Sequence, residues 1–308
     1  MLFEDFFDEW YDSTRDYIVA HTSGSTGTPK EIRLAKSDMA VSARRTNAFF
    51  GIDCHSTLVC PLSLDYIAGK MMAVRAILSG AMLVQIPPSN DFTMSWNLQA
   101  DLIAIVPSQV DALLKIVRTR RVFNAIIGGA PLDDARRKAL KSAGVNAYET
   151  YGMTETASHV ALRHINAEDF RGLDGFTFST DQRSCLVIES ADMTFRRLVT
   201  NDIVEMTGAN TFRWLGRADN VINSGGIKIV IEQLEAEIAA IFPDLQFYVG
   251  RQPDDKWGEV PVMYVKGVGD TDAIARELAS RLDHRRLPRS VIAVAEFPLT
   301  ANGKIKRQ

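Results

Sequence analysis

Short apolar runs alternate with amphipathic stretches over the first half of the chain. Runs with the length of buried β-strands occupy residues 17–21, 57–60, 82–86, 102–106 and 123–127. Apolar positions with helical spacing, each with a suitable N-cap residue nearby, occupy residues 37–50, 108–117 and 133–143. Strands that alternate with helices indicate an α/β fold whose sheet is substantially parallel.

The pattern changes in the second half. Strand-like runs separated by turn residues occupy 185–189, 198–205 and 211–215, which predicts a β-rich subdomain at about 180–218. A helix at 231–241 with strands and one more helix at 260–265, 273–282 and 291–295 then predicts a small α+β unit. We therefore expect two domains, residues 1–218 and 219–308, which meet near Asp219.

Composition and charge narrow the function. The formal net charge of the 308 residues is −3, whereas nucleic-acid-binding domains usually carry a basic excess, so a role on nucleic acid is not expected. The acidic, aromatic N-terminus MLFEDFFDEW is unlike a secretory signal, and no apolar run reaches the ~20 residues of a membrane helix. Cys54, Cys60 and Cys185 form no disulfide framework, and each is expected to be buried. We expect a cytoplasmic protein.

A glycine-rich segment, HTSGSTGTPK at 21–30, follows the first strand-like run. Glycines let backbone N–H groups approach phosphate oxygens, hydroxyls donate further hydrogen bonds, and Lys30 adds a positive charge. The segment lacks the GxxxxGK[ST] spacing of a P-loop. It predicts phosphate binding, although an isolated segment of this kind also suits a surface turn.

Residues 23–30 resemble the signature loop of the adenylate-forming enzymes, a family of acyl- and aryl-CoA ligases, peptide-synthetase adenylation domains and luciferases. Other motifs resembling those of the family follow in the same order: GGAP at 128–131, YETYGMTET at 148–156, TND at 200–202, GRADN at 216–220, SGGIKI at 224–229 and PLTANGKI at 298–305. The resemblance spans nearly the whole chain. It implies a large adenylate-binding domain with mixed or parallel sheets flanked by helices, and a small mobile C-terminal catalytic domain.

The resemblance also assigns roles to individual residues. ATP would lie against Thr22, Ser23, Gly24, Ser25, Thr26, Gly27, Lys30, Gly129, Ala130, Tyr151, Gly152, Asp202 and Arg217. Thr154 would bind the α-phosphate, Glu155 would hold Mg²⁺, and Lys304 would reach the reacting carboxylate. Asp219 would be the hinge, and Gly225 and Gly226 would flank the path of coenzyme A. Each short motif taken by itself also suits an ordinary turn.

Two departures from the family pattern matter. Only about twenty residues precede the glycine-rich segment, so the family's usual N-terminal subdomain is expected to be missing. One hypothesis is a homodimer, in which a second chain covers the face that this subdomain normally covers. The segment that begins Pro61-Leu62 also lacks the histidine of the family's Pro-Leu-x-His, and Tyr66 is a candidate replacement.

The acyl pocket is expected to include Tyr66, Lys70, Ser158, His159 and Arg163. Cations beside an uncharged acyl chain would be poorly solvated, so they favour a substrate with a second carboxylate. The other interpretation is that Lys70 and Arg163 face solvent or pair with acidic residues.

The resemblance implies two half-reactions: a carboxylic acid and ATP form an acyl-adenylate and pyrophosphate, and coenzyme A then takes the acyl group. Within the family the motifs look most like those of the bacterial ligases that act on o-succinylbenzoate in menaquinone synthesis. Another acyl- or aryl-acid CoA ligase, or an enzyme that loads a carrier protein, remains an alternative. A non-catalytic adenylate-binding protein, or a subunit that needs a partner, is the alternative of a different class.

Overall fold

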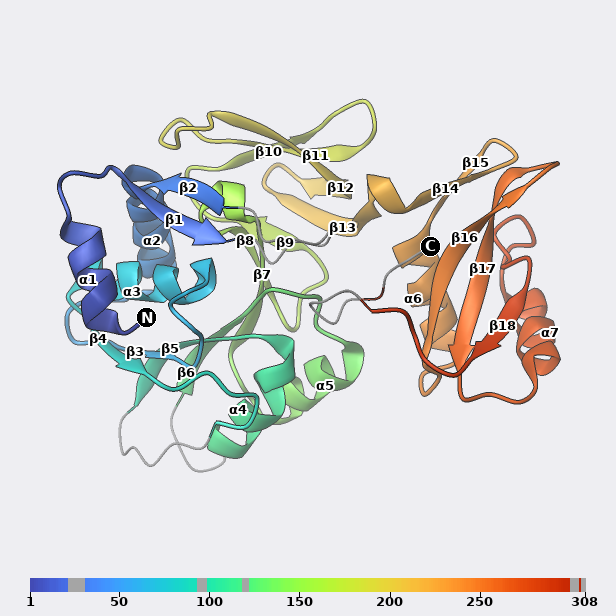
Figure 1. Cartoon of the computed structure of the whole chain (residues 1–308), viewed down its shortest axis with the longest axis horizontal. Helices are drawn as coiled ribbons and strands as arrows, with labels where there is room; N and C mark the ends of the chain where they lie inside the picture. The colour runs from blue at the N-terminus through green and yellow to red at the C-terminus, as the bar shows by residue number, and fades with distance from the viewer. Residues whose placement is uncertain (22–30, 93–98, 118–121, 300–304, 306–308) are drawn as a thin grey trace.

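The computed structural model describes residues 1–21, 31–92, 99–117, 122–299 and 305. Within these residues the chain forms an 11-stranded sheet, a 5-stranded sheet and a two-stranded sheet. Figure 1 shows the 5-stranded sheet and its helices to one side of a larger body that contains the other two sheets. The mixed α/β architecture agrees with the expected fold class.

The 11-stranded sheet has a parallel half and an antiparallel half. The parallel half contains β3 (Thr57–Cys60), β4 (Met82–Gln85), β5 (Ala100–Ile105), β6 (Val122–Ile127) and β7 (Ala147–Gly152), in the order β4-β3-β5-β6-β7. The antiparallel half contains β8 (His159–His164), β9 (Phe170–Gly172), β10 (Thr177–Thr180), β11 (Cys185–Glu189), β12 (Arg197–Gly208) and β13 (Thr211–Arg217). The two halves are continuous because β8 pairs antiparallel with β7.

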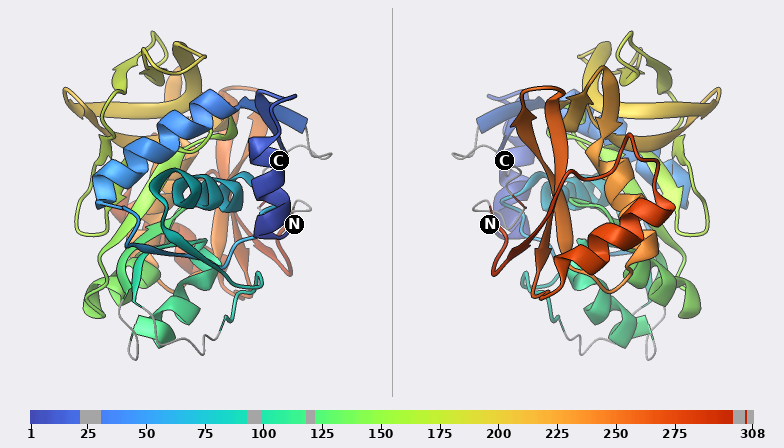
Figure 2. Two further views of the ribbon diagram at one scale, coloured as in Figure 1. Left: turned by 90° about the vertical axis from the view of Figure 1, so that its left-hand side faces the viewer. Right: turned by 90° about the vertical axis from the view of Figure 1, so that its right-hand side faces the viewer.

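Helices cover both faces of the parallel half: α2 (Lys36–Phe50), α3 (Ile67–Ser79), α4 (Val110–Val117) and α5 (Asp134–Ser142). Successive side chains of a strand point to opposite faces. Leu58 of β3 accordingly packs in one cluster with Met72 of α3, whereas Val59 packs in another with Leu113 of α4 and Leu140 of α5. Figure 2 shows α2 and α3 on one side of the sheet and α4 and α5 on the other.

The N-terminal part packs against α3. Helix α1 (Phe3–Tyr11) precedes a hairpin of β1 (Tyr17–His21) and β2 (Glu31–Ala35), which pair antiparallel with each other. The fully buried Phe6 lies in one cluster with Ile18 and Met71. The first strand-like run is therefore not a member of the large sheet, although the alternation of strands and helices had suggested that it would be.

The C-terminal part has a hydrophobic core of its own. It contains β14 (Val221–Ser224), β15 (Ile227–Val230), α6 (Ile231–Ile241), β16 (Phe247–Asp254), β17 (Gly258–Lys266), α7 (Thr271–Arg281) and β18 (Val291–Val294). Leu234 and Ile238 of α6 pack with Met263 of β17 and Leu278 of α7. The short η3 helix (Ala218–Asn220) joins this unit to β13.

Two smaller expectations can be compared with the structure. In the described part of the chain, no helix is long and apolar enough to cross a membrane. Cys60 and Cys185 are buried, as expected, but Cys54 is exposed because it lies in the turn that joins α2 to β3.

Candidate active site

A pocket of about 430 Å³ lies at the carboxyl ends of the parallel strands. Helix α3 follows β3 on one face of the sheet and α4 follows β5 on the opposite face, so the chain diverges between these neighbouring strands. In open α/β sheets such a divergence leaves a crevice for ligands. Leu62 after β3, Val106 after β5 and Gly128 after β6 line this pocket. At the end of β7 and in the turn that follows, residues 152–155 and 157–159 also line it.

The turn after β7 places the motif residues at the pocket. A Cβ atom on Gly152 would lie 2.4 Å from the carbonyl oxygen of Ser158, so only glycine fits there. The fully buried Thr156 closes the turn: its hydroxyl accepts from the Met153 N–H at 3.0 Å and lies 2.7 Å from the Ser158 carbonyl oxygen, to which it donates. Thr154 and Glu155 are thereby held at the pocket wall.

Replacing Thr156 with valine is expected to lower the free energy of unfolding by about 0.5–1.5 kcal/mol, because it leaves the partly buried Met153 N–H and Ser158 carbonyl without their hydroxyl partner. Urea denaturation followed by circular dichroism would measure the change. The exposed Thr177 of β10 offers a matched control, for which the same substitution should change stability little. Equal effects of the two substitutions would contradict the bracing role of Thr156.

Glu155 is suited to share a magnesium ion with a phosphate. Its side chain is exposed at the pocket, and it makes no ion pair with any described residue. The described residues contain no group of three or more His, Cys, Asp or Glu that could hold a metal. Mg²⁺ is usually bound through one or two carboxylates together with substrate phosphates, and a single unpaired carboxylate at the pocket fits that arrangement.

Arg75 of α3 lines the pocket, although it was not among the expected site residues. Its side chain is almost fully buried; Nη2 donates to Ser158 Oγ at 2.8 Å, and Nη1 lies 3.4 Å from Met72 Sδ. Nε has no partner, and no carboxylate among the described residues pairs with the guanidinium. Burial lowers the pKa of Arg75 to about 10, so the group stays cationic at neutral pH. An unpaired buried cation beside a pocket is suited to bind an anion.

Ser158 and His159 lie next to Arg75 and also line the pocket. The imidazole of His159 is buried, with Nε2 at 3.1 Å from Thr46 Oγ1 and Nδ1 at 3.4 Å from Ser158 Oγ. Burial, and to a smaller extent the charge of Arg75, lowers the pKa of His159 well below 6.5. His159 is therefore neutral in the folded protein at physiological pH.

The buried His159 makes the stability of the protein depend on pH. Below pH 6.5 the unfolded chain binds a proton at this histidine and the folded chain does not, so stability falls as the pH falls, by up to about 1.4 kcal/mol per pH unit. The His159→Gln variant should lose about 1 kcal/mol less than the unsubstituted protein between pH 7.5 and pH 5.5 in urea denaturation. Parallel pH profiles for the two proteins would contradict the prediction.

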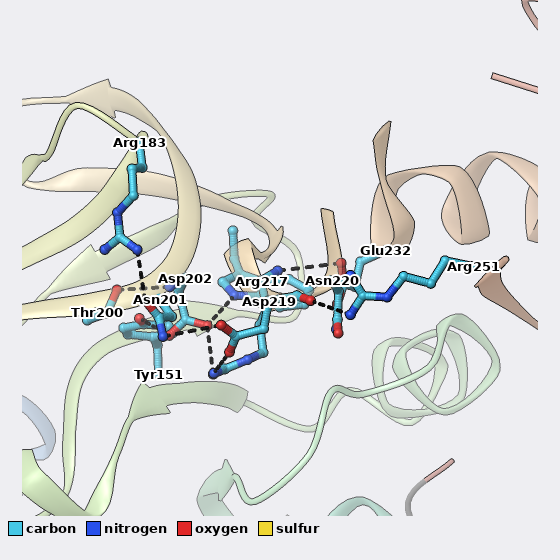
Figure 3. A network of polar contacts seen from close by, with 11 residues as sticks. Tyr151, Arg183, Thr200, Asn201, Asp202, Arg217, Asp219, Asn220, Glu232 and Arg251 are labelled. Atoms are coloured by element: carbon cyan, nitrogen blue, oxygen red, sulfur yellow. Dashed lines mark hydrogen bonds and ion pairs between the residues drawn. The ribbon is translucent and has the colours of Figure 1, made fainter. Parts of the chain in front are cut away.

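Tyr151, Asp202 and Arg217 form a second polar group, shown in Figure 3. Asp202 and Arg217 are paired across β12 and β13. The Tyr151 hydroxyl donates to Asp202 Oδ2 at 2.7 Å, Trp214 Nε1 donates to Oδ1 at 3.3 Å, and Arg217 Nη1 lies 3.6 Å from Oδ1. Burial, followed by the charge of Asp202, raises the pKa of Tyr151. The Tyr151 ring packs against Phe212. Tyr151, Asp202 and Arg217 do not line the pocket described above.

The expected hinge residue, Asp219, lies in η3 and has contacts on both sides (Figure 3). Its carboxylate accepts from Arg217 Nη2 at 2.7 Å, and its carbonyl oxygen accepts from Arg251 Nη2 of β16 at 3.1 Å. The neighbouring Asn220 donates to Glu232 of α6 at 2.5 Å. Polar contacts therefore link the η3 segment to strands of both sheets.

Other expected site residues are placed as follows. Gly225 and Gly226 form the turn between β14 and β15, with φ of 57° and 85°, and the Gly225 N–H donates to the Trp257 carbonyl at 2.8 Å. Gly129, with φ of 85°, lines the pocket, whereas the neighbouring Ala130 is exposed and outside its lining. The residues that lie outside the described part of the chain are Thr22, Ser23, Gly24, Ser25, Thr26, Gly27, Lys30 and Lys304.

Three residues expected in the acyl pocket do not line it. Tyr66 precedes α3 and is 57% exposed. Lys70 forms an ion pair with Glu9 of α1 at 3.2 Å, and Arg163 forms one with Glu149 at 2.9 Å. Of the two interpretations of these cations, the pairing with acids is the one that the geometry supports, so we leave both out of the proposed pocket.

The chain is similar to proteins of known family. A model of the family described as AMP-binding enzyme matches residues 8–181. Two relatives are 2-succinylbenzoate–CoA ligases: that of Listeria monocytogenes is 25% identical over 97% of this chain and 70% of its own length, and that of Enterococcus faecalis is 24% identical over 94% and 68%.

Solved structures extend the similarity. An acyl-CoA synthetase (AMP-forming)/AMP-acid ligase II-like protein of Dyadobacter fermentans is 33% identical, with a TM-score of 0.67 over 98% of this chain and 90% of that chain. The o-succinylbenzoate CoA synthetase of Bacillus subtilis with its acyl-adenylate intermediate is 19% identical, with a TM-score of 0.78 over 94% and 67%, and so shares the fold. The family match covers more than half of the chain, and the chain belongs to the AMP-binding enzyme family.

Proposed function

We propose that the protein is an acid–CoA ligase that activates o-succinylbenzoate for menaquinone biosynthesis. A carboxylate oxygen of the acid attacks the α-phosphorus of ATP, and the bond to pyrophosphate breaks to give the acyl-adenylate. The thiol of coenzyme A then attacks the acyl carbon, AMP leaves, and the thiol proton passes to solvent. The family and the names of the curated relatives support this reaction.

The observation that carries the substrate assignment is the buried guanidinium of Arg75 at the pocket. o-Succinylbenzoate has two carboxylates: the succinyl carboxylate reacts with ATP, and the ring carboxylate stays ionised. A cation with no acidic partner among the described residues would pair with that second carboxylate. An acid with one carboxylate would leave Arg75 buried without a counter-charge, which is unfavourable.

The remaining roles follow from the family and from the placement of the described residues. Thr154 and Glu155, at the pocket, would bind the α-phosphate and Mg²⁺. Mg²⁺ bound there would compensate the negative charge of the phosphates. Asp202 would bind the ribose, and Arg217 would contact the ribose or the phosphate. Asp219 would be the hinge about which the C-terminal unit turns between the two half-reactions. Lys304 would act in the first half-reaction.

The test measures pyrophosphate release with ATP and Mg²⁺ for o-succinylbenzoate, 3-benzoylpropionate, benzoate, succinate and a fatty acid, each with and without coenzyme A. 3-Benzoylpropionate is the same acid without the ring carboxylate, so it isolates the contribution of that group. Strong release with o-succinylbenzoate, and its CoA thioester by mass spectrometry, are expected. Equal rates for the two acids would overturn the substrate assignment, and no release with any acid would overturn the proposed activity.

We also propose a cytoplasmic location, where ATP and coenzyme A are supplied, and a homodimer. Light scattering at micromolar concentration is expected to give twice the mass of one chain, 34.2 kDa. A single-chain mass would contradict the dimer and leave the proposed reaction unaffected.

A further inference from the structure

A chain of hydrogen bonds runs behind the pocket and joins three elements. It begins at Arg75 of α3, passes through Ser158 and His159 at the start of β8, and ends at Thr46 of α2. The Thr46 hydroxyl in turn lies 3.1 Å from the Ser42 carbonyl oxygen, to which it donates. Thr46 is fully buried and His159 is 5% exposed, so water does not compete for these contacts.

The direction of each hydrogen bond in this series follows from the contact between Thr46 and Ser42. Because Thr46 donates its only hydroxyl hydrogen to Ser42, its oxygen is an acceptor for the Nε2–H of His159. His159 Nδ1 then has no hydrogen and accepts from the Ser158 hydroxyl at 3.4 Å, the longest contact of the series. With its hydrogen used in this way, Ser158 Oγ presents lone pairs to Arg75 Nη2 at 2.8 Å. A single neutral tautomer of His159 satisfies all of these contacts.

These contacts restrict the orientation of the guanidinium. One end of the Arg75 fork is held by Ser158, while Nε has no partner and Nη1 has a sulfur neighbour, a weak acceptor. Because Nε is itself buried, the donors left for a ligand are the remaining hydrogens of Nη1 and Nη2. An anion-binding arginine gains affinity when its fork is already oriented, because less rotational freedom is lost on binding.

We infer that His159 is a positioning residue for substrate selection: held as its Nε2–H tautomer by Thr46, it directs the Ser158 hydroxyl and so fixes Arg75 to receive the second carboxylate of the acid. The inference rests on the proposed function, since it requires an acid with two carboxylates. His159 acts through Ser158 and Arg75, and it has no part in the bond-making steps. If its role were only structural, replacing it would affect all acids alike.

The test compares kcat and KM for o-succinylbenzoate and 3-benzoylpropionate in four variants. His159→Leu removes both ring contacts. Thr46→Val removes the acceptor for Nε2–H together with the donor to the Ser42 carbonyl, and leaves the imidazole in place. His159→Gln retains an amide N–H that can reach Thr46. The exposed His284 gives a matched control, His284→Gln. We expect His159→Leu to lower the preference for o-succinylbenzoate at least tenfold, mainly through KM. Thr46→Val should lower it less, and His159→Gln should restore most of it.

An unchanged preference in folded His159→Leu and Thr46→Val, or equal losses for both acids, would overturn the inference. If unsubstituted protein does not prefer o-succinylbenzoate at all, the proposed function fails instead, so the two failures are distinguishable. The tautomer provides a test that needs no variant to be active: ¹⁵N NMR of histidine-labelled protein at pH 7 should show His159 with Nε2 protonated and Nδ1 bare. A protonated Nδ1 would overturn the inferred series of hydrogen bonds from Thr46 to Arg75, even if His159→Leu does not fold.

Discussion

Replacing Arg75 with methionine is expected to weaken the apparent affinity for o-succinylbenzoate by about 30-fold to 5,000-fold, the range for removing one partner of a buried charge pair. The affinity for 3-benzoylpropionate should change much less, because that acid has no ring carboxylate to pair with the guanidinium. The change would be measured as KM in the pyrophosphate-release assay and as Kd by calorimetry. Arg75→Lys keeps the charge but not the two-pronged donor geometry, so its affinity for o-succinylbenzoate is expected to lie between those of the unsubstituted protein and Arg75→Met.

Replacing Arg75 with methionine should leave the stability of the ligand-free protein unchanged or raise it. The lowering of the Arg75 pKa to about 10 by burial corresponds to roughly 3 kcal/mol against the charged form in the folded state. Replacing a buried ion with an apolar side chain of similar volume is often neutral or stabilises a protein by about 1–4 kcal/mol. Urea denaturation of Arg75→Met should therefore show an unchanged or higher free energy of unfolding. Lower stability combined with equal losses for both acids would mean that Arg75 is structural.

Strong local patterns made much of the fold predictable. The strands Thr57–Cys60 and Cys185–Glu189 and the helix Ile231–Ile241 have the expected bounds, because a short apolar run or a single apolar helix face is an unambiguous signal. The helix expected at 133–143 is α5, and Asp133 caps it by accepting a hydrogen bond from the Arg136 N–H. By contrast α2 begins at Lys36, one residue before the expected start, and its N-cap residue, Ala35, makes no side-chain hydrogen bond.

Other features depend on long-range contacts that local patterns do not reveal. Helix α3 was not predicted because IAGKMMAVRAILS is apolar on nearly every side, and its residues 69–76 are buried from all directions. The β-rich segment expected as a subdomain at about 180–218 is instead part of the large sheet, a continuity that depends on the pairing of β7 with β8. The spacing of residues in the sequence does not show which strands pair with each other.

The candidate site shows the same division. The motif residues Gly152, Thr154, Glu155, Ser158 and His159 line one pocket, because they are close together in one short segment at the end of β7. For Lys70 and Arg163, however, charge type was the only sequence signal, and their acidic partners, Glu9 and Glu149, are distant in sequence. Arg75 did carry a signal: it is a lone arginine in the apolar part of a helix, which is costly unless the charge has a use.

Replacing Lys304 with alanine is expected to slow formation of the acyl-adenylate by about 100-fold to 1,000-fold, the range for removing one group that stabilises developing charge. In this half-reaction an anionic carboxylate approaches an anionic phosphate, so a cation between them lowers the barrier. In the second half-reaction a thiol attacks an activated acyl carbon, and a lysine at the phosphate is not needed. Transfer from supplied acyl-adenylate to coenzyme A should therefore stay within about threefold of the unsubstituted rate.

The two half-reactions can be measured separately, by ATP–pyrophosphate exchange with the acid and by thioester formation from synthetic o-succinylbenzoyl-adenylate. Lys306→Ala is the matched control, because it removes the same charge two positions along the chain and is expected to slow neither step appreciably. Lys304→Arg keeps the charge on a bulkier head group and should recover only part of the first step. Equal losses in both half-reactions would place Lys304 in general binding or folding, and would remove the reason for the C-terminal unit to turn between the steps.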